Sequence, residues 1–215
     1  MSCVAARKNQ NKQLNWPLNM RYTQLLTDVS HCTLCSEHLP HGANPVLQFH
    51  PSARILIAGQ APGSKVHLSG IPFADASGDR LRQWMGVDNE TFYDARQIAI
   101  LPMGFCYPGR GKSGDRPPRP ECAATWRTAL LNKLQHLELT LVIGRYALDW
   151  HLPDTGATRS RVTVTEQVRN WQQHWPDTLV LPHPSPRNNI WLKKNQWFAT
   201  EVLPILRQRV NALTE

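Results

Sequence analysis

The chain has 215 residues, which is enough for one ordinary domain with a full hydrophobic core, and no second domain is needed. Lys and Arg outnumber Asp and Glu by 24 to 16, so the surface should attract polyanions; nucleic acid is the first candidate, and a merely basic soluble protein is an equal alternative. No apolar run approaches the roughly 18 residues of a membrane span, and the start lacks the apolar stretch of a signal peptide, so we expect a cytoplasmic protein without membrane contact.

Strands and helices are predicted to alternate after a polar start. Residues 1–18 should form a loose basic arm, and residues 19–215 the folded domain. Short apolar runs predict buried parallel strands at 53–59, 97–104, 139–144 and 178–183. Helical periodicity predicts helices at 20–29, 78–87, 121–137, 165–175 and 191–213. Most of the tryptophans sit at helical positions with apolar neighbours, so we assign them to the core (Trp84, Trp126, Trp150, Trp171, Trp197). This order predicts the α/β class: a three-layer α/β/α sandwich with a central four-stranded, mostly parallel sheet.

Four of the five cysteines form the pattern C-x2-C-x70-C-x15-C, at Cys32, Cys35, Cys106 and Cys122. In a reducing compartment, cysteines point to metal binding or catalysis rather than to disulfides. Only the first pair is close in sequence, so the fold would have to bring the other two to it. Zinc, an iron–sulfur cluster and unliganded thiols all remain open from the spacing alone.

Two loops that follow predicted strands carry the chemistry. The stretch GQAPG (59–63) suits a ligand-binding loop, although a plain structural turn is the more common meaning of such a sequence. The stretch HPSPRN (183–188) holds one histidine between rigid prolines, at the expense of ordinary strand or helix pairing. We therefore expect its polar groups to be held in one place.

Two further segments supply candidate polar groups. In GIPFADASGDRL (70–81), Ser77 is predicted to cap the helix that begins near Gly78, which leaves Asp75 just outside the N-terminus; a simple Asx turn is the alternative for this aspartate. The loop YPGRGKSGDRPPRP (107–120) is rich in Gly, Pro and Arg, which suits phosphate contacts or a solvated connection.

Taken in order, these motifs resemble the uracil-DNA glycosylase superfamily over residues 30–207, and within it the iron–sulfur families four and five. The resemblance implies a DNA-repair enzyme that hydrolyses the glycosidic bond of a flipped-out deaminated base. It also implies a monomer in the bacterial cytosol whose partner is single- or double-stranded DNA with a damaged base. Its cysteine layout implies a four-iron four-sulfur cluster, with zinc the less expected occupant, on Cys32, Cys35, Cys106 and Cys122.

The resemblance assigns roles to individual residues. His183 would donate a hydrogen bond to the flipped base, and Phe73 would stack on it. Gly59, Gln60 and Ala61 would line the base pocket. The DNA-binding candidates are Lys65, Arg110, Lys112, Ser185, Arg187 and Asn188, with Arg187 also placed to enter the helix as a wedge.

Two positions depart from the family pattern. Family four has a water-holding glutamate where this chain has Gln60, so Asp75 inherits the carboxylate role, with Asp79 in reserve. The asparagine that reads the uracil edge is replaced by Pro102, which leaves uracil, hypoxanthine and xanthine open as substrates. A lesion-binding protein without catalysis, and a hydrolase of free nucleosides or nucleotides, are the alternative functions.

Overall fold

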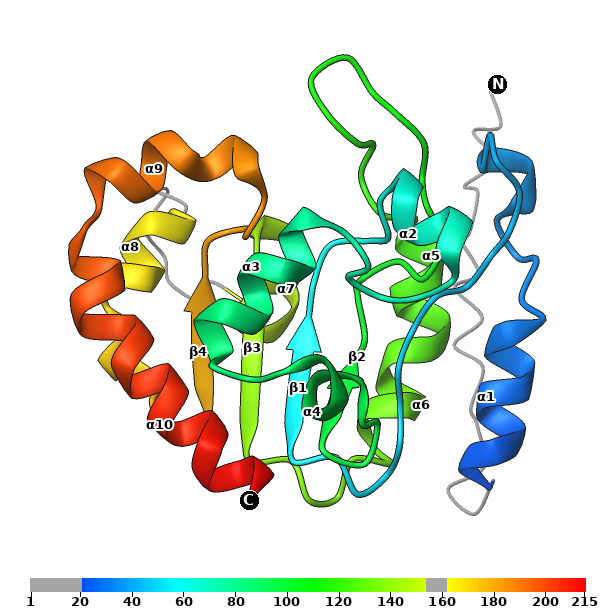
Figure 1. The fold of residues 1–215 in the computed structure, drawn as a ribbon. Coiled ribbons are helices and arrows are strands. Elements are labelled where there is room, and N and C mark those ends of the chain that lie inside the picture. Colours follow the sequence, from blue (N-terminus) through cyan, green and yellow to red (C-terminus); the bar gives the residue numbers. More distant parts are fainter. Residues whose placement is uncertain (1–20, 154–161) are drawn as a thin grey trace, which may run out of the picture.

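The computed structural model describes residues 21–153 and 162–215, so the expected arm at residues 1–18 lies outside them. Its centre is a four-stranded sheet in the order β2-β1-β3-β4 (Figure 1). The strands are β1 (Ile55–Ala58), β2 (Ile98–Ile100), β3 (Leu139–Ile143) and β4 (Thr178–Leu181), and every pair is parallel. The structure therefore confirms the predicted fold class.

The strands form where short runs of β-branched and aliphatic residues can be buried on both faces. Every residue of β1, β2 and β3 is buried. Alternate side chains serve different faces. Ile55 and Ile57 pack in one hydrophobic cluster, whereas Leu56 between them packs in the other. A parallel sheet needs helices on both faces, because each face would otherwise expose a continuous apolar surface.

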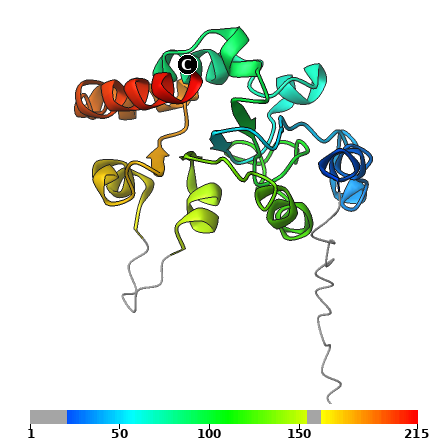
Figure 2. The same cartoon turned by 90° about the horizontal axis from the view of Figure 1, so that it is seen from below.

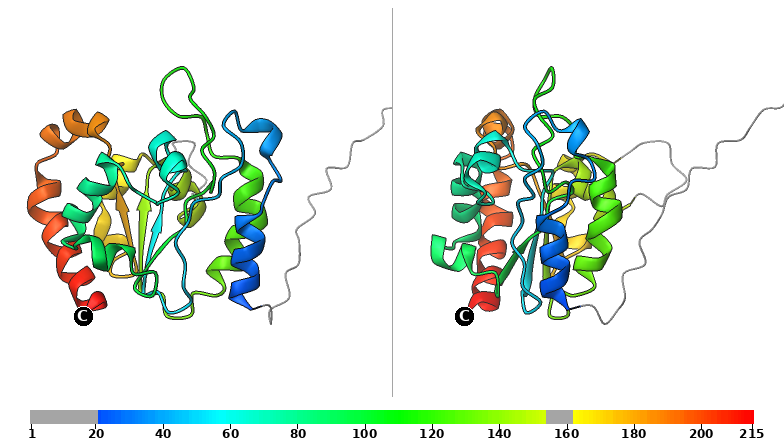
Figure 3. Two further views of the ribbon diagram at one scale, coloured as in Figure 1. Left: turned by 45° about the vertical axis from the view of Figure 1, so that its right-hand side comes forward. Right: turned by 90° about the vertical axis from the view of Figure 1, so that its right-hand side faces the viewer.

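Helices cover the two faces (Figures 2 and 3). One face carries α3 (Ala76–Met85), α4 (Asn89–Tyr93) and α10 (Leu203–Thr214). The other carries α6 (Thr128–Leu131), α7 (Arg145–His151) and α8 (Val164–Arg169). At the β2 side, α1 (Tyr22–Ser30) packs against α6 through Leu25, Val29 and Leu130.

Shorter elements connect these layers. They are η1 (Ser36–His38), α2 (Ser64–Ser69), α5 (Pro120–Cys122), η2 (Ala123–Arg127), η3 (Trp171–Gln173), η4 (Pro186–Asn188), α9 (Asn189–Lys194) and η5 (Phe198–Val202). The segments α5, η2 and α6 follow one another without a break, as the predicted helix at 121–137 required, although this helix already ends at Leu131. Within the described residues, no helix is long and apolar enough to cross a membrane.

The prediction of a single helix at 191–213 is wrong, because the helix is interrupted at Asn195. This residue caps the end of α9 with φ −123° and ψ 58°. Its side-chain amide donates to the Trp191 carbonyl at 2.8 Å, and its side-chain oxygen accepts from Trp197 Nε1 at 3.1 Å. Asparagine side chains compete in this way with helical backbone bonds, so the helix stops and a new one starts.

The assignment of tryptophans to the core holds for some and fails for one. Trp84 and Trp126 are only 5% and 6% exposed. Trp150, however, is 38% exposed, and the guanidinium of Arg127 lies 5.8 Å from its ring centroid. The buried residues of α7 are Ala147 and Leu148, so Trp150 lies on the less covered side of this helix.

Candidate active site

A cleft of about 660 Å³ opens where the parallel strands end. It is lined by residues that follow β1, β2, β3 and β4, which meet at one edge of the sheet as this topology requires. The predicted site residues among its lining are Gly59, Gln60, Ala61, Lys65, Phe73, Asp75, His183, Ser185, Arg187 and Asn188. The fold thus brings the two strand-following loops and the PFAD segment into one cleft.

The HPSPRN loop is held by hydrogen bonds within itself. The backbone N–H of Ser185 donates to His183 Nδ1 at 3.1 Å. The side-chain amide of Asn188 donates to the His183 carbonyl at 2.7 Å, and the Ser185 hydroxyl accepts from the backbone of Arg187 at 3.3 Å. Because Nδ1 accepts a hydrogen bond, the neutral imidazole carries its proton on Nε2.

The electrostatic surroundings keep this imidazole neutral. Burial lowers the pKa of His183 below its usual range; Asp75 and Asp115 act in the opposite direction, and Arg187 adds to the lowering. At neutral pH the side chain is therefore an uncharged donor at Nε2. A donor held in this state needs no rearrangement when negative charge develops beside it.

Asp75 caps α3, contrary to the prediction that Ser77 would. Its backbone is extended, and Oδ1 accepts from the N–H groups of Ser77 and Gly78, both at 3.0 Å. The helix begins at Ala76, two residues earlier than the sequence indicated. An aspartate at the N-terminus is favoured by the exposed N–H groups and the helix dipole, and this one also lines the cleft.

Phe73 sits in a strained conformation next to the same cap. Its φ is 55°, the one positive value outside glycine among the described residues. Such strain persists only where the surroundings impose it, and it is common at functional sites. The ring lies over the first loop, since a Cβ added to Gly59 would be 3.8 Å from Phe73 Cζ. Phe73 and Gly59 are therefore brought together, as predicted.

Asp79, the reserve carboxylate, does not reach the cleft. Its side chain is 75% exposed and pairs with Arg82 at 2.6 Å. Asp75 is therefore the better-placed carboxylate of this segment.

The GQAPG loop is tied to the segment that follows β2. The carbonyls of Gly59 and Gln60 accept from the N–H groups of Met103 and Gly104 at 2.9 and 3.0 Å. The Gln60 side-chain amide donates to the Arg116 carbonyl at 3.3 Å. The loop is thereby fixed between the cleft and a projecting hairpin.

That hairpin, residues 109–116, rises above the strand ends as the green loop at the top of Figure 1. It is closed by Arg116 N–H to Gly109 carbonyl and by an antiparallel bridge between Arg110 and Asp115. Arg110 and Lys112, both predicted to bind DNA, are exposed on it and lie outside the cleft lining. They occupy a rim that a polyanion could approach.

The sequence reasoning missed two residues that the fold adds to this site. Arg80 of α3 donates to the Ser185 carbonyl at 3.1 Å and to Asn189 Oδ1 at 2.8 Å, which links the Asp75 helix to the His183 loop. Asp115 of the hairpin lines the cleft. No local pattern singles out either residue, because their partners lie far away in the chain.

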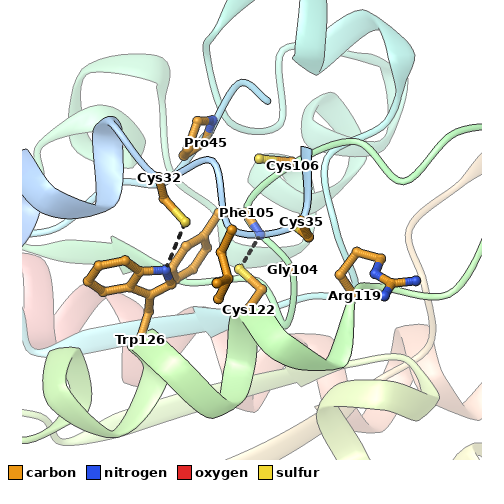
Figure 4. A pocket seen from close by; sticks show the side chains of 10 residues that line it. Cys32, Cys35, Pro45, Gly104, Phe105, Cys106, Arg119, Cys122 and Trp126 are labelled. Atoms are coloured by element: carbon orange, nitrogen blue, oxygen red, sulfur yellow. Dashed lines mark hydrogen bonds between the residues drawn. The ribbon is translucent and has the colours of Figure 1, made fainter. Parts of the chain in front are cut away.

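A second site holds the cysteines. Cys32, Cys35, Cys106 and Cys122 line one cavity (Figure 4). Two N–H groups point at sulfur: Trp126 Nε1 lies 3.3 Å from Cys32 Sγ, and the Phe105 backbone nitrogen lies 3.3 Å from Cys122 Sγ. The fold has therefore gathered four thiols from segments up to 90 residues apart, taking Cys32 and Cys122 as the extremes.

Electrostatics also show that these thiols form one group. Burial, together with repulsion from Cys32 and Cys35, raises the pKa of Cys122 to about 12 and that of Cys106 to about 11. Metal ligation reverses such shifts, because a metal holds cysteines as thiolates. The four-cysteine donor set fits iron–sulfur clusters as well as structural zinc. In the described ranges, no three His, Cys, Asp or Glu side chains are close enough for a single ion.

Arg127 connects the cysteine helix to the cleft. It is fully buried, and it donates to the carbonyls of Leu101 and Pro102 and to His151 Nε2. Burial lowers its pKa to about 10, with a partial offset from Cys122. Pro102 lines the cleft, so this buried cation supports the cleft wall from behind.

Comparison with known families agrees with this geometry. The model of the uracil DNA glycosylase superfamily matches residues 47–207, which include both strand-following loops and the PFAD segment. That range is three quarters of the chain, and it supports a DNA glycosylase-like hydrolase of the base-excision repair class. The chain belongs to the uracil DNA glycosylase superfamily.

Proposed function

We propose that this protein is a monofunctional DNA glycosylase that hydrolyses the N-glycosidic bond of a flipped-out deaminated base, uracil first, and leaves an abasic site. The observation that carries the proposal is the state of His183. Its Nδ1 accepts from Ser185 and its pKa is lowered by burial, which together leave a neutral Nε2–H donor in a cleft that also holds Asp75 and Phe73.

The proposed reaction begins with extrusion of the base, because its glycosidic bond cannot be reached inside a stacked duplex. Phe73 stacks on the extruded base. As the bond from C1′ to the base nitrogen breaks, its electron pair moves onto the base, and His183 donates a hydrogen bond to the base oxygen that gains negative charge. Asp75 stabilises the positive charge left on the sugar, and water adds to C1′.

Base selection is proposed to depend on groups other than an asparagine. Families four and five have an asparagine at the position of Pro102. The Pro102 carbonyl already accepts a hydrogen bond from Arg127. The Gln60 side chain and backbone groups of the first loop line the cleft instead. Uracil is the first substrate to test, with hypoxanthine and xanthine as the other arms.

The test uses oligonucleotides that carry each base, with strand cleavage by alkali after incubation. We expect excision by the wild type and no strand break before alkali. His183→Ala and Asp75→Asn should each lose roughly 10²-fold or more in single-turnover rate. Asp79→Asn is the matched control, because this exposed carboxylate lies outside the cleft lining. Equal losses in Asp79→Asn would contradict the assigned roles.

A second candidate is a lesion-binding protein without catalysis. It is favoured by the commitment of Asp75 Oδ1 to the helix cap, which is a sufficient structural reason for an aspartate at this position. It predicts tight binding of uracil or abasic sites without release of base, and indifference to Asp75→Asn. Gel-shift titration beside the excision assay separates the two candidates.

We also propose that the four cysteines hold a four-iron four-sulfur cluster. The shared cavity and the four-thiol donor set support this assignment. The cluster would act as a structural clamp that ties the end of α1 to the loop after β2 and to α5. Anaerobic purification should yield iron and acid-labile sulfide in equal amounts, and Cys106→Ala should lower both; zinc in their place would overturn the assignment. We further propose that the protein acts as a monomer in the cytosol.

A further inference from the structure

Among the residues that line the cleft in the described part of the chain, there are two carboxylates, Asp75 and Asp115. Asp75 has one oxygen fixed by two backbone N–H groups at the start of α3. An oxygen that already accepts two such bonds has little lone-pair capacity left for a water molecule. Asp115 makes no helix cap, so its lone pairs are the freer ones.

The Asp115 side chain is positioned over the GQAPG loop. A Cβ added to Gly63 would lie 3.9 Å from Asp115 Oδ2. Burial raises the pKa of Tyr107, a residue only 4% exposed, and the nearby Asp115 carboxylate raises it further. The charge of Asp115 also reaches His183, since it opposes the lowering of the pKa of that imidazole. The carboxylate therefore lies close to the first loop, and its charge acts on the histidine.

The hairpin that carries Asp115 is held in place. Gly111 N–H donates to the Gly114 carbonyl at 2.6 Å at its tip, and Gln60 binds the Arg116 carbonyl at its base. A Cβ added to Gly114 would be 3.3 Å from a nitrogen of Arg187. The hairpin thus touches the loops on both sides of the cleft mouth.

A carboxylate is unexpected in this hairpin if the hairpin serves only to bind DNA. The sequence GRGKSGDR carries Arg110, Lys112 and Arg116 with one acid, Asp115. That acid is exposed beside the cleft, where it would repel phosphates. A group that weakens DNA binding, yet lines the cleft, points to a role in chemistry.

We propose that Asp115 is a catalytic residue that holds the attacking water and accepts its proton, while Asp75 stabilises the sugar cation. This inference rests on the proposed glycosylase function. In the step, the water oxygen forms a bond to C1′ and the bond from C1′ to the base nitrogen breaks. The bonding pair leaves with the base, which His183 stabilises. One water proton passes to the Asp115 carboxylate and then to solvent or to the departed base.

The test compares single-turnover excision by wild type, Asp115→Asn, Asp115→Ala and Tyr107→Phe. Asp115→Asn should lose roughly 10²-fold or more in rate, within the range typical of a lost general base. It should bind an oligonucleotide with a non-cleavable base analogue at least as tightly as wild type, because a negative charge is removed. Added formate should restore part of the rate of Asp115→Ala, since it supplies a carboxylate in the vacated space.

Tyr107→Phe separates chemistry from structure. It removes the phenol hydroxyl near Asp115 but keeps the carboxylate, so the rate should stay within about tenfold of wild type, less than the loss expected for a missing base. The proposal is overturned if Asp115→Asn excises within about threefold of wild type while His183→Ala is inactive, or if formate has no effect on Asp115→Ala. A wild type that releases no base from any lesion would instead overturn the glycosylase function, and this inference with it.

Discussion

Gly78→Ala tests the close approach of α3 to the strained Phe73. A Cβ at position 78 would overlap the Phe73 carbonyl oxygen and lie 2.7 and 2.8 Å from its carbonyl carbon and Cβ. These are backbone or near-backbone atoms, so relief requires a shift of about 1 Å of the helix or of the PFAD segment. Because Gly78 N–H also binds Asp75, either shift disturbs the cap and the cleft together.

The magnitude follows from two opposing effects. Overpacking of a rigid site costs about 1–3 kcal/mol or more, and the better helix propensity of alanine returns about 1 kcal/mol. We expect a net loss of about 2 kcal/mol in the free energy of unfolding, and a melting temperature roughly 4–8 °C lower. A displacement of about 1 Å at the reacting groups should also reduce excision by roughly 10²-fold.

Gly70→Ala is the matched control. Unlike Gly78, Gly70 has a positive φ, 68°, but nothing lies within 4 Å of an added Cβ. It should lose about 1 kcal/mol through backbone strain and keep its excision rate. Both variants are compared by urea denaturation and single-turnover kinetics. A Gly78→Ala protein that is as stable and as active as wild type would refute the claim that this glycine holds Phe73 and Asp75 in place.

Three further predictions concern the surroundings of the cleft. Arg80→Met removes the guanidinium that donates to the Ser185 carbonyl. The free energy of unfolding should therefore fall by about 1 kcal/mol, and the excision rate should fall roughly tenfold. An unchanged rate would show that the His183 loop does not need this hydrogen bond. Burial, with Arg127 adding to it, lowers the pKa of His151 from 6.5 to about 4, so the unfolded state binds more protons in that window. Acidification from pH 6.5 to 4 should therefore remove up to about 3 kcal/mol of stability, and urea titrations of His151→Gln should lack this loss. Arg110→Gln should lower the salt slope of duplex binding by about 0.9, and an unaltered slope would place the hairpin away from phosphates.

The architecture followed from local patterns that the sequence displays directly. Each strand lies inside its predicted run, because a short and mostly apolar run is typical of a strand that is buried on both faces of a parallel sheet. The loops at 59–63 and 183–188 come directly after strands, so a common edge for both could be expected from the order of elements alone. The prediction of one C-terminal helix failed at Asn195. There a side-chain hydrogen bond replaces a helical backbone bond, and helical periodicity cannot detect this replacement.

The candidate site was predictable in part for the same reason. His183 and Asp75 were identified from their motifs, and the fold brings both to one cleft. The cap on α3 was assigned to Ser77 instead of Asp75, because both residue types can cap a helix and the backbone angles decide between them.

Periodicity and turn chemistry act over a few residues, so the sequence alone was enough to define the four strands, part of the helices and the two strand-following loops. The tertiary structure was needed for whatever joins distant segments: the four cysteines in one cavity, Arg80 against the His183 loop, and Asp115 beside Gly63. These contacts depend on where the ends of the strands and the projecting hairpin meet in space. No short stretch of sequence carries that information, because hydrogen bonds and charge interactions depend on distance in space rather than on separation along the chain.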